Sequence, residues 1–293
     1  MNQLSIPYRI FQLFNFALLS VLSVLCILPL VHVLALSFSG RAAASANIVT
    51  LWPIGFTLEA YEKSLANPNF STALLVSLER TVLGTIVSMA VIFLAAYALS
   101  KEESVFKGRS VYAWFFVFTM LFNGGLVPWY ITIQKLHLMN TIWALVLPGA
   151  LNVFNLVLMM NFFRGVPKDL EEAALIDGAS HFTTLFRIFL PISMPSIATI
   201  SLFTMVYHWN SWFDGLILMK HPDQYPLQSY LQTVVIQGDT SLMGFDNIED
   251  LALISERTTR AAQIFVGALP ILCVYPFLQR FFISGIVLGS VKG

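Results

Sequence analysis

Charged side chains are scarce in this chain. Its 293 residues include 16 Lys and Arg and 16 Asp and Glu, a charged share of 11%. Soluble domains contain about 25% charged residues, and here the hydrophobic share is 57% with 25 Phe. A soluble globular domain is therefore excluded, and we predict an all-α polytopic membrane protein. The formal net charge of zero provides no basic surface, so we expect no nucleic-acid partner.

Cysteines are few and catalytic motifs are missing. Cys26 and Cys273 both lie in apolar runs, where a thiol behaves as a small hydrophobe and a structural disulfide is not expected. The sequence has no GxxxxGK[ST] segment, so we expect the chain not to bind ATP itself. It also has no HExxH and no GxSxG within an apolar run, which argues against an intramembrane enzyme. We therefore predict no catalytic residue, no metal site and no cofactor bound by this chain.

Six apolar runs are long enough to cross a bilayer, which takes about 20 mainly apolar residues. We predict a single transmembrane domain over residues 1–293, with spans at about 11–37, 81–99, 111–129, 142–162, 192–212 and 261–282. The first run is too long for a signal peptide and has no clear small-x-small cleavage site. We interpret it as a retained first span.

The distribution of Lys and Arg predicts the orientation. Segments 1–9, 100–110, 164–190 and 280–293 together hold nine Lys or Arg. The alternate segments 39–80, 130–140 and 213–260 are longer in total and hold seven. The bias places both termini and the loop 164–190 in the cytoplasm.

The loop 164–190 has the sequence features of two short helices. Pro167 suits a helix N-terminus, acidic side chains follow it where the helix dipole is positive, and Gly178 supplies a stop. Ser180 is placed to cap a second helix, which we expect to end at Pro191. A plain amphipathic hairpin between two spans is the simpler interpretation.

The spacing of this loop argues against that simpler interpretation. Glu172-Ala173-Ala174 is followed after three residues by Gly178, and nine residues later by Ile188-x-Leu190-Pro191. This pattern resembles the EAA loop of ABC-importer permeases. The resemblance implies a cytoplasmic coupling helix that docks on a partner ATPase, with two ATPase subunits that bind ATP and Mg. By position, the ATPase-coupling residues are Glu171, Glu172, Ala173, Ala174, Asp177 and Gly178.

The resemblance extends over the whole chain. The six spans, the outer segments and the tail 289–293 are similar to the carbohydrate-uptake, maltose-permease-like family. The stretches 122–128 and 209–213 look closer still to permeases of oligosaccharide and polysaccharide importers such as the alginate importer. The resemblance implies a type I ABC importer permease fold in the bacterial inner membrane. It also implies a related but different second permease, an extracytoplasmic solute-binding protein and a carbohydrate substrate.

Polar and aromatic groups inside the spans are candidates for a translocation path, because buried polar groups in a bilayer are costly. They are Asn152, Asn155, Tyr207, His208, Trp209, Asn210, Trp212 and Asp214. Rings suit the C–H faces of sugars, while amides and a carboxylate suit hydroxyl groups. An interfacial aromatic belt and interhelical hydrogen bonding by Asn are the alternatives.

Two further alternatives concern charge. The segment 213–260 has seven acidic and three basic residues, which suits either a contact with a binding protein or a solvated loop. A secondary carrier for sugars or other small solutes, not driven by ATP, is the alternative function. It would need acids or bases within the spans for ion coupling, and the spans lack such a set. Glu79 and Arg80 are adjacent, and we expect them to form a local ion pair.

Overall fold

The computed structural model describes residues 6–236 and 256–289, and the side chains of 7–234 and 257–277. All regular structure in these residues is helical. The chain divides into two compact units, one within residues 1–71 and 233–269 and the other within 72–232 and 270–293. The tail 290–293 and most of the acidic side chains of segment 213–260 lie outside the described residues.

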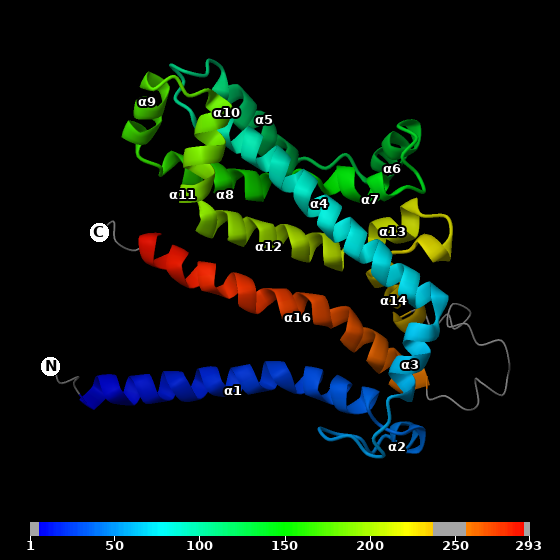
Figure 1. Cartoon of the computed structure of the whole chain (residues 1–293). Helices are drawn as coiled ribbons and strands as arrows, with labels where there is room; N and C mark the ends of the chain where they lie inside the picture. The colour runs from blue at the N-terminus through cyan, green and yellow to red at the C-terminus, as the bar shows by residue number, and fades with distance from the viewer. Residues whose placement is uncertain (1–5, 237–255, 290–293) are drawn as a thin grey trace. The chain divides into compact units, whose positions relative to one another are not determined.

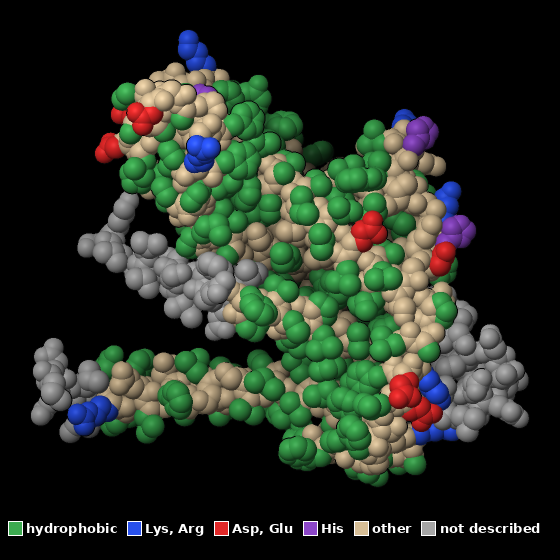
Figure 2. Space-filling model, viewed as in Figure 1, with side chains coloured by type: hydrophobic (Ala, Val, Ile, Leu, Met, Phe, Trp, Pro, Cys, Tyr) green, Lys and Arg blue, Asp and Glu red, His purple; other side chains and the backbone are tan. Residues whose placement is uncertain are grey.

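The first unit contains the long helix α1 (Ile6–Ser37), the short helices α2 (Arg41–Ser45) and α3 (Glu59–Ala66), and the first part of α16 (Glu256–Gly289). All side chains of residues 7–27 of α1 are exposed, most of them apolar, and Figure 2 shows apolar side chains along the face in view. Such a helix requires an apolar environment around it. The predicted span 11–37 lies within α1, which is consistent with a helix surrounded by lipid or by another protein.

Hydrogen bonds attach the segment after α1 to the end of that helix. His32 Nδ1 lies 2.7 Å from the carbonyl oxygen of Thr50, and Ser37 Oγ lies 2.6 Å from the hydroxyl of Tyr61. The ring of Phe38 packs against Tyr61 with 4.9 Å between centroids. These contacts give His32 a structural role.

The second unit is organised along helix α4 (Pro68–Ser100), which belongs to it from residue 72 onward. In Figure 1, α9 and α10 lie at one end of α4, and α6, α7 and α13 lie at the other. The other helices of this unit are α5 (Arg109–Leu121), α6 (Leu126–Lys135), α7 (Ile142–Val146), α8 (Val153–Arg164), α9 (Lys168–Ile176), α10 (His181–Thr184), α11 (Leu190–Ile192), α12 (Met194–Asn210), α13 (Phe213–Leu218), α14 (Leu227–Leu231) and the last part of α16. Short 3₁₀ turns at Leu147–Gly149 and Pro222–Gln224 and a π-helical turn at Leu185–Phe189 connect some of them; a second π-helical turn, Gln232–Ile236, follows α14.

Three of the predicted spans are bent pairs of helices. The axes change direction by 116° between α5 and α6, by 51° between α7 with its 3₁₀ turn and α8, and by 87° before α12. The first break follows from its sequence, because Gly125 has a φ of +89° and its N–H donates to Asn123 Oδ1 at 2.8 Å. Counting each bent pair as one span, the described residues contain up to six candidate spans.

The observed bounds differ from the predicted ones where the chain bends. Span 111–129 covers α5 and only the start of α6, whereas 81–99 and 261–282 each lie within one longer helix. Pro270 and Pro276 lie inside the continuous helix α16. The sequence predicts loosened or bent spans at Gly124, Gly125, Pro128 and Pro148. Breaks lie at or beside these residues, but an average of hydropathy does not register how far the direction changes.

Two apolar clusters hold the second unit together. The larger lies where α4, α8, α12 and the turn 185–189 meet; its buried members include Met89, Ile92, Tyr97, Leu156, Met159, Phe163, Leu185, Phe189 and Ile200. The smaller lies near the opposite end of α4 and contains Ile133, Ala144, Leu145, Leu218 and Met219. Each cluster therefore lies beside one end of α4.

Two glycines allow the end of α12 to approach its neighbours. A Cβ at Gly84 of α4 would lie 2.6 Å from the ring of His208, and one at Gly149 would lie 2.7 Å from the ring of Tyr207. Both side chains come from adjacent positions of α12 and point to different partners. Glycine is thus required for the close packing of α12 against its neighbours.

Gly84→Ala tests this close approach. The new methyl group would clash with the buried ring of His208, and overpacking of this kind costs about 1–3 kcal/mol. We expect a lower unfolding midpoint in detergent, measured by intrinsic fluorescence. Gly124→Ala is the control, because a Cβ there has no atom within 4 Å, and we expect a change of less than about 0.5 kcal/mol. Equal midpoints for wild type and Gly84→Ala would contradict the packing.

Candidate functional site

Helix α9 forms where the loop motif predicts a helix. Pro167 precedes it in an extended conformation, and Asp169 and Glu171 lie in its first turn. It ends in a Schellman motif: Ala179 N–H donates to the carbonyl of Ala174 at 2.9 Å, and Gly178 N–H to that of Leu175 at 3.0 Å. Gly178 has a φ of +79°, which favours glycine. The stop predicted at Gly178 is confirmed.

The outer face of α9 is open. Glu172, Ala173, Asp177 and Gly178 are exposed, and Ala174 is half-buried. Ile176 is 85% exposed, which is unusual for so large an apolar side chain and suits a protein contact. In Figure 2 charged side chains also gather over this end of the unit.

Glu171 is placed differently from Glu172. Its Oε1 accepts from Lys101 Nζ at 2.5 Å, and the lysine side chain is only 8% exposed. The same ammonium lies 3.6 Å from the ring centroid of Tyr97 and 4.3 Å from that of Phe189. Burial lowers the pKa of Lys101, while the hydrogen bond and charge of Glu171 act in the opposite direction. Glu171 therefore attaches α9 to the end of α4.

The second helix of the loop connects α9 to the core. Ser180 Oγ accepts from Thr183 N–H at 3.2 Å, so the predicted cap is confirmed. The segment ends at Ile192, one residue after the predicted end at Pro191, and the chain bends at Ser193. Phe189 within this segment packs edge-on against the ring of Phe163 at 5.5 Å. A displacement of α9 would therefore reach the large apolar cluster directly.

At the opposite end of α4 lies an open pocket of about 590 Å³. Of the eight candidates for the translocation path, it brings together Tyr207, Asn210, Trp212 and Asp214. Its other lining residues are Trp129, Pro148, Gly149, Val206, Ser211 and Phe213. Trp129 and the turn 147–149 were not predicted as site residues, because only the bends of the chain place them beside α12.

The other four candidates do not line this pocket. Asn152 is exposed and caps α8, accepting from Asn155 N–H at 3.2 Å. Asn155 is buried, and its amide lies 3.4 Å from Thr204 Oγ1 of α12. His208 and Trp209 are also buried, with His208 Nε2 3.4 Å from Ser88 Oγ. In this structure Asn155 joins α8 to α12 and His208 joins α12 to α4, whereas Asn152 caps its own helix.

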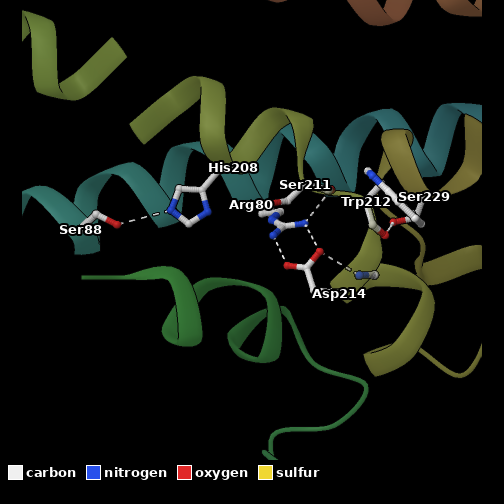
Figure 3. A network of polar contacts seen from close by, with 8 residues as sticks. Arg80, Ser88, His208, Ser211, Trp212, Asp214 and Ser229 are labelled. Atoms are coloured by element: carbon white, nitrogen blue, oxygen red, sulfur yellow. Dashed lines mark hydrogen bonds and ion pairs between the residues drawn. The ribbon is translucent and has the colours of Figure 1, made fainter. Parts of the chain in front are cut away.

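A buried ion pair lies behind the pocket wall and includes Asp214 of its lining (Figure 3). Arg80 has no exposed side-chain surface, and its guanidinium forms a two-pronged pair with Asp214: Nη1 donates to Oδ1 at 3.1 Å, and Nη2 donates to Oδ2. Nη1 also donates to the carbonyl of Ser211 at 3.1 Å. The pair therefore holds the α12–α13 junction against α4.

The expected local pair of Glu79 with Arg80 is wrong. Glu79 is exposed, whereas Arg80 is fully buried. Neighbouring residues on a helix point in different directions, so adjacency in sequence does not bring their charges together. The acid that pairs with Arg80 is 134 positions further along the chain.

The two regions are separated by about the thickness of a membrane. Arg80 and Ser100 are 20 positions apart on one helix, which at a rise of 1.5 Å per residue is about 30 Å. The hydrocarbon core of a bilayer is also about 30 Å thick. Helix α4 therefore connects the pocket directly to the base of α9.

Comparison with known proteins identifies the family. Residues 104–287 match the model of the binding-protein-dependent transport system inner membrane component. The chain belongs to this family. It is a multi-pass membrane component of a binding-protein-dependent transporter, and the predicted resemblance to ABC-importer permeases is confirmed.

Several relatives match the permease over nearly its full length. The polygalacturonan/rhamnogalacturonan transport system permease protein YtcP of Bacillus subtilis (strain 168) is 39% identical and covers 97% of this chain and 99% of its own. Protein LplC of the same organism is also 39% identical, covering 97% and 96%. The arabinooligosaccharides transport system permease protein AraQ of Halalkalibacterium halodurans (strain ATCC BAA-125 / DSM 18197 / FERM 7344 / JCM 9153 / C-125) is 27% identical, covering 92% of each.

A solved structure matches the permease with a TM-score of 0.87 and 30% identity, covering 96% of this chain and 100% of the other. It is described as a bacterial ABC transporter that imports the acidic polysaccharide alginate. The predicted all-α ABC importer permease fold is thereby confirmed. The alternative of a secondary carrier is not supported by these relatives.

Arg80→Met tests the buried ion pair. It leaves the carboxylate of Asp214, which is 19% exposed, without its cationic partner, and breaking such a pair costs about 3–5 kcal/mol. We expect a lower unfolding midpoint and reduced assembly of the permease. Glu79→Gln is the matched control and should behave as wild type.

The single variant Asp214→Leu and the double variant Arg80→Met/Asp214→Leu complete the double-mutant cycle. Because the double variant removes both charges, it should be more stable than Arg80→Met alone. Additive losses in the double variant would show that the two side chains do not stabilise each other.

Proposed function

We propose that this chain is the permease subunit of an ATP-driven importer of oligosaccharide or polysaccharide. The observation that carries the proposal is the open pocket, in which Trp129, Tyr207 and Trp212 lie with Asn210 and Asp214. Aromatic faces cover the C–H surfaces of a sugar ring, and amide and carboxylate oxygens accept from its hydroxyls. This combination suits a carbohydrate better than an ion or an apolar solute.

The relatives support the same substrate class. Their names refer to polygalacturonan and rhamnogalacturonan, to arabinooligosaccharides and to galactooligosaccharides, and the matching solved structure belongs to an alginate importer. Some of these substrates are acidic and others are neutral. The Asp214 carboxylate in the pocket is neutralised by Arg80. We therefore propose that the pocket selects sugar rings and hydroxyls, and that net charge contributes little to binding there.

The energy is proposed to come from two partner ATPase subunits, which bind ATP and Mg. The absence of a GxxxxGK[ST] segment supports a chain without its own ATPase site. The exposed residues Glu172, Ala173 and Ile176 of α9 are suited to contact an ATPase. Closure of the ATPases would push α9, and Lys101 and Phe189 would pass the movement to α4 and the apolar core.

The proposed orientation has α9 and both termini in the cytoplasm and the pocket facing outward. The excess of Lys and Arg in segments 1–9, 100–110, 164–190 and 280–293 supports it. An extracytoplasmic solute-binding protein would deliver sugar at the pocket end, and release inward would follow ATP hydrolysis. A related but different permease would complete the path, because the pocket of this chain is open on one side and six spans are few for a complete gated path.

Trp212→Ala tests the sugar pocket in the purified complex reconstituted in liposomes. Loss of one aromatic face from a binding site costs about 1.4 kcal/mol, so we expect the half-saturating sugar concentration for uptake to rise about tenfold. Trp114→Ala is the matched control, because Trp114 on α5 is 71% exposed and does not line the pocket. Polygalacturonate fragments and a neutral oligosaccharide serve as the two substrates.

Two results would contradict the proposal. Unchanged uptake of both sugars by Trp212→Ala would exclude the pocket as the sugar site. Uptake by the chain alone, without ATPase subunits and after ATP depletion, would establish a secondary carrier.

Ala173→Phe tests the coupling surface. The residue is exposed on a helix, so the larger side chain is accommodated by this chain but obstructs a protein that docks there. We expect an assembled complex with sugar-stimulated ATPase activity reduced at least about tenfold, as for the loss of a well-packed contact. Ala90→Phe, at an exposed position in the middle of α4, is the control. Normal stimulation in Ala173→Phe would remove α9 from the coupling path.

A further inference from the structure

A second cavity lies beside α9, and the exposed side chains of Glu172 and Leu175 are among its lining residues. It has a volume of about 420 Å³ and lies between the end of α4, the connection to α5, the end of α8 and α9. Its ionisable lining residues are Lys101, Glu102, Arg109, Arg164, Lys168, Glu171 and Glu172. The proposed transport function uses only some of these groups.

The charges of this cavity are not balanced pair by pair. Lys101 pairs with Glu171, and Lys168 pairs with Glu102. Mutual attraction lowers the pKa of Glu102 and raises that of Lys168, which also interacts with Glu172. The two lysines balance two of the three carboxylates, and Glu172 shares Lys168 with Glu102, so the four basic and three acidic residues leave the cavity one net positive charge.

Two guanidiniums are left without a carboxylate. Arg109 Nη1 donates to the carbonyl of Lys101 at 3.1 Å, and Arg164 Nη2 donates to that of Leu99 at 3.2 Å. Among the described residues neither arginine forms an ion pair, and Arg109 Nε is buried without a hydrogen-bond partner. The two positive charges also repel each other. A guanidinium has five N–H donors, so most donors of this pair remain available.

The local backbone adds positive potential. Helix α5 begins at Arg109, has no acidic residue in its first turn and has no side-chain cap at Gly108. The positive end of its dipole therefore adds to the charge of Arg109. An anion between Arg109 and Arg164 would relieve this repulsion, and two guanidiniums match the oxygen geometry of a phosphate.

We propose that Arg109 and Arg164 bind a phosphate oxyanion in this cavity, and that the phosphate is the headgroup of an anionic phospholipid. The cavity also has apolar walls at Val105, which is 63% exposed, and Leu175, which is 43% exposed. These walls suit the glycerol and upper acyl chain of a lipid better than a free phosphate. The inference rests on the proposed function, in which this end of the molecule lies at the cytoplasmic membrane face. A lipid held there would brace α9 against α4.

The test measures bound lipid in the complex of the permease with its ATPases, extracted in mild detergent. Mass spectrometry determines the phosphatidylglycerol retained per complex. We expect wild type to retain it and Arg109→Gln/Arg164→Gln to retain at least about tenfold less, because the variant lacks the charged hydrogen bonds to the phosphate. Lys107→Gln, which removes an exposed positive charge from the same connection but does not line the cavity, should retain the lipid.

Inorganic phosphate distinguishes the two sources of the oxyanion. If wild type retains no lipid but phosphate raises its unfolding midpoint saturably, and the double variant lacks this shift, the site binds soluble phosphate. Equal lipid retention in wild type and the double variant, or no retention and no phosphate shift in wild type, would overturn the site.

Two precautions keep the result interpretable. If the double variant does not assemble, Arg164→Gln alone is used, because Arg164 is exposed and its loss leaves the α5 N-terminus intact. Sugar uptake is measured separately in the same preparations. Unchanged lipid retention beside active uptake would refute the lipid site alone, whereas lipid retention without sugar uptake would count against the proposed function alone.

Discussion

The buried contact between Arg80 and Asp214 is the constraint on which the pocket depends. A guanidinium with no exposed side-chain surface is costly in an apolar environment, and the carboxylate of Asp214 and the carbonyl of Ser211 offset this cost at its two terminal nitrogens. Those partners come from the junction between α12 and α13. Their position fixes where Trp212 and Asp214 stand in the pocket wall.

The same helix has a second charged contact at its other end. Lys101, directly after α4, holds Glu171 of α9 while its ammonium lies against the rings of Tyr97 and Phe189. One straight element of about 30 Å thus connects two ion pairs, one beside the pocket and one behind the proposed ATPase contact. Because a helix is stiff along its axis, a movement imposed on α9 can reach the pocket through α4 without passing through flexible loops.

Bends in the chain shape the pocket between these fixed points. The break at 122–125 turns α6 back so that Trp129 reaches the pocket, and the turn at 147–149 brings Pro148 and Gly149 beside Tyr207. Glycine and proline at these places free the backbone from the regular helix. The freed backbone groups then lie beside an open pocket, where irregular structure in a membrane protein is tolerated.

The sequence by itself determined the class of the protein, its apolar runs, the helix at 168–176 and its stop at Gly178. These features depend on composition and on contacts within a few residues, which the order of amino acids expresses directly. Only the tertiary structure decided that Arg80 pairs with Asp214 and not with its neighbour Glu79, and that Glu171 pairs with Lys101 while Glu172 stays exposed. It also divided the eight predicted path residues into four that line the pocket and four that do not. Residues distant in sequence come together because each broken helix resumes in a new direction. Local sequence patterns do not specify that direction.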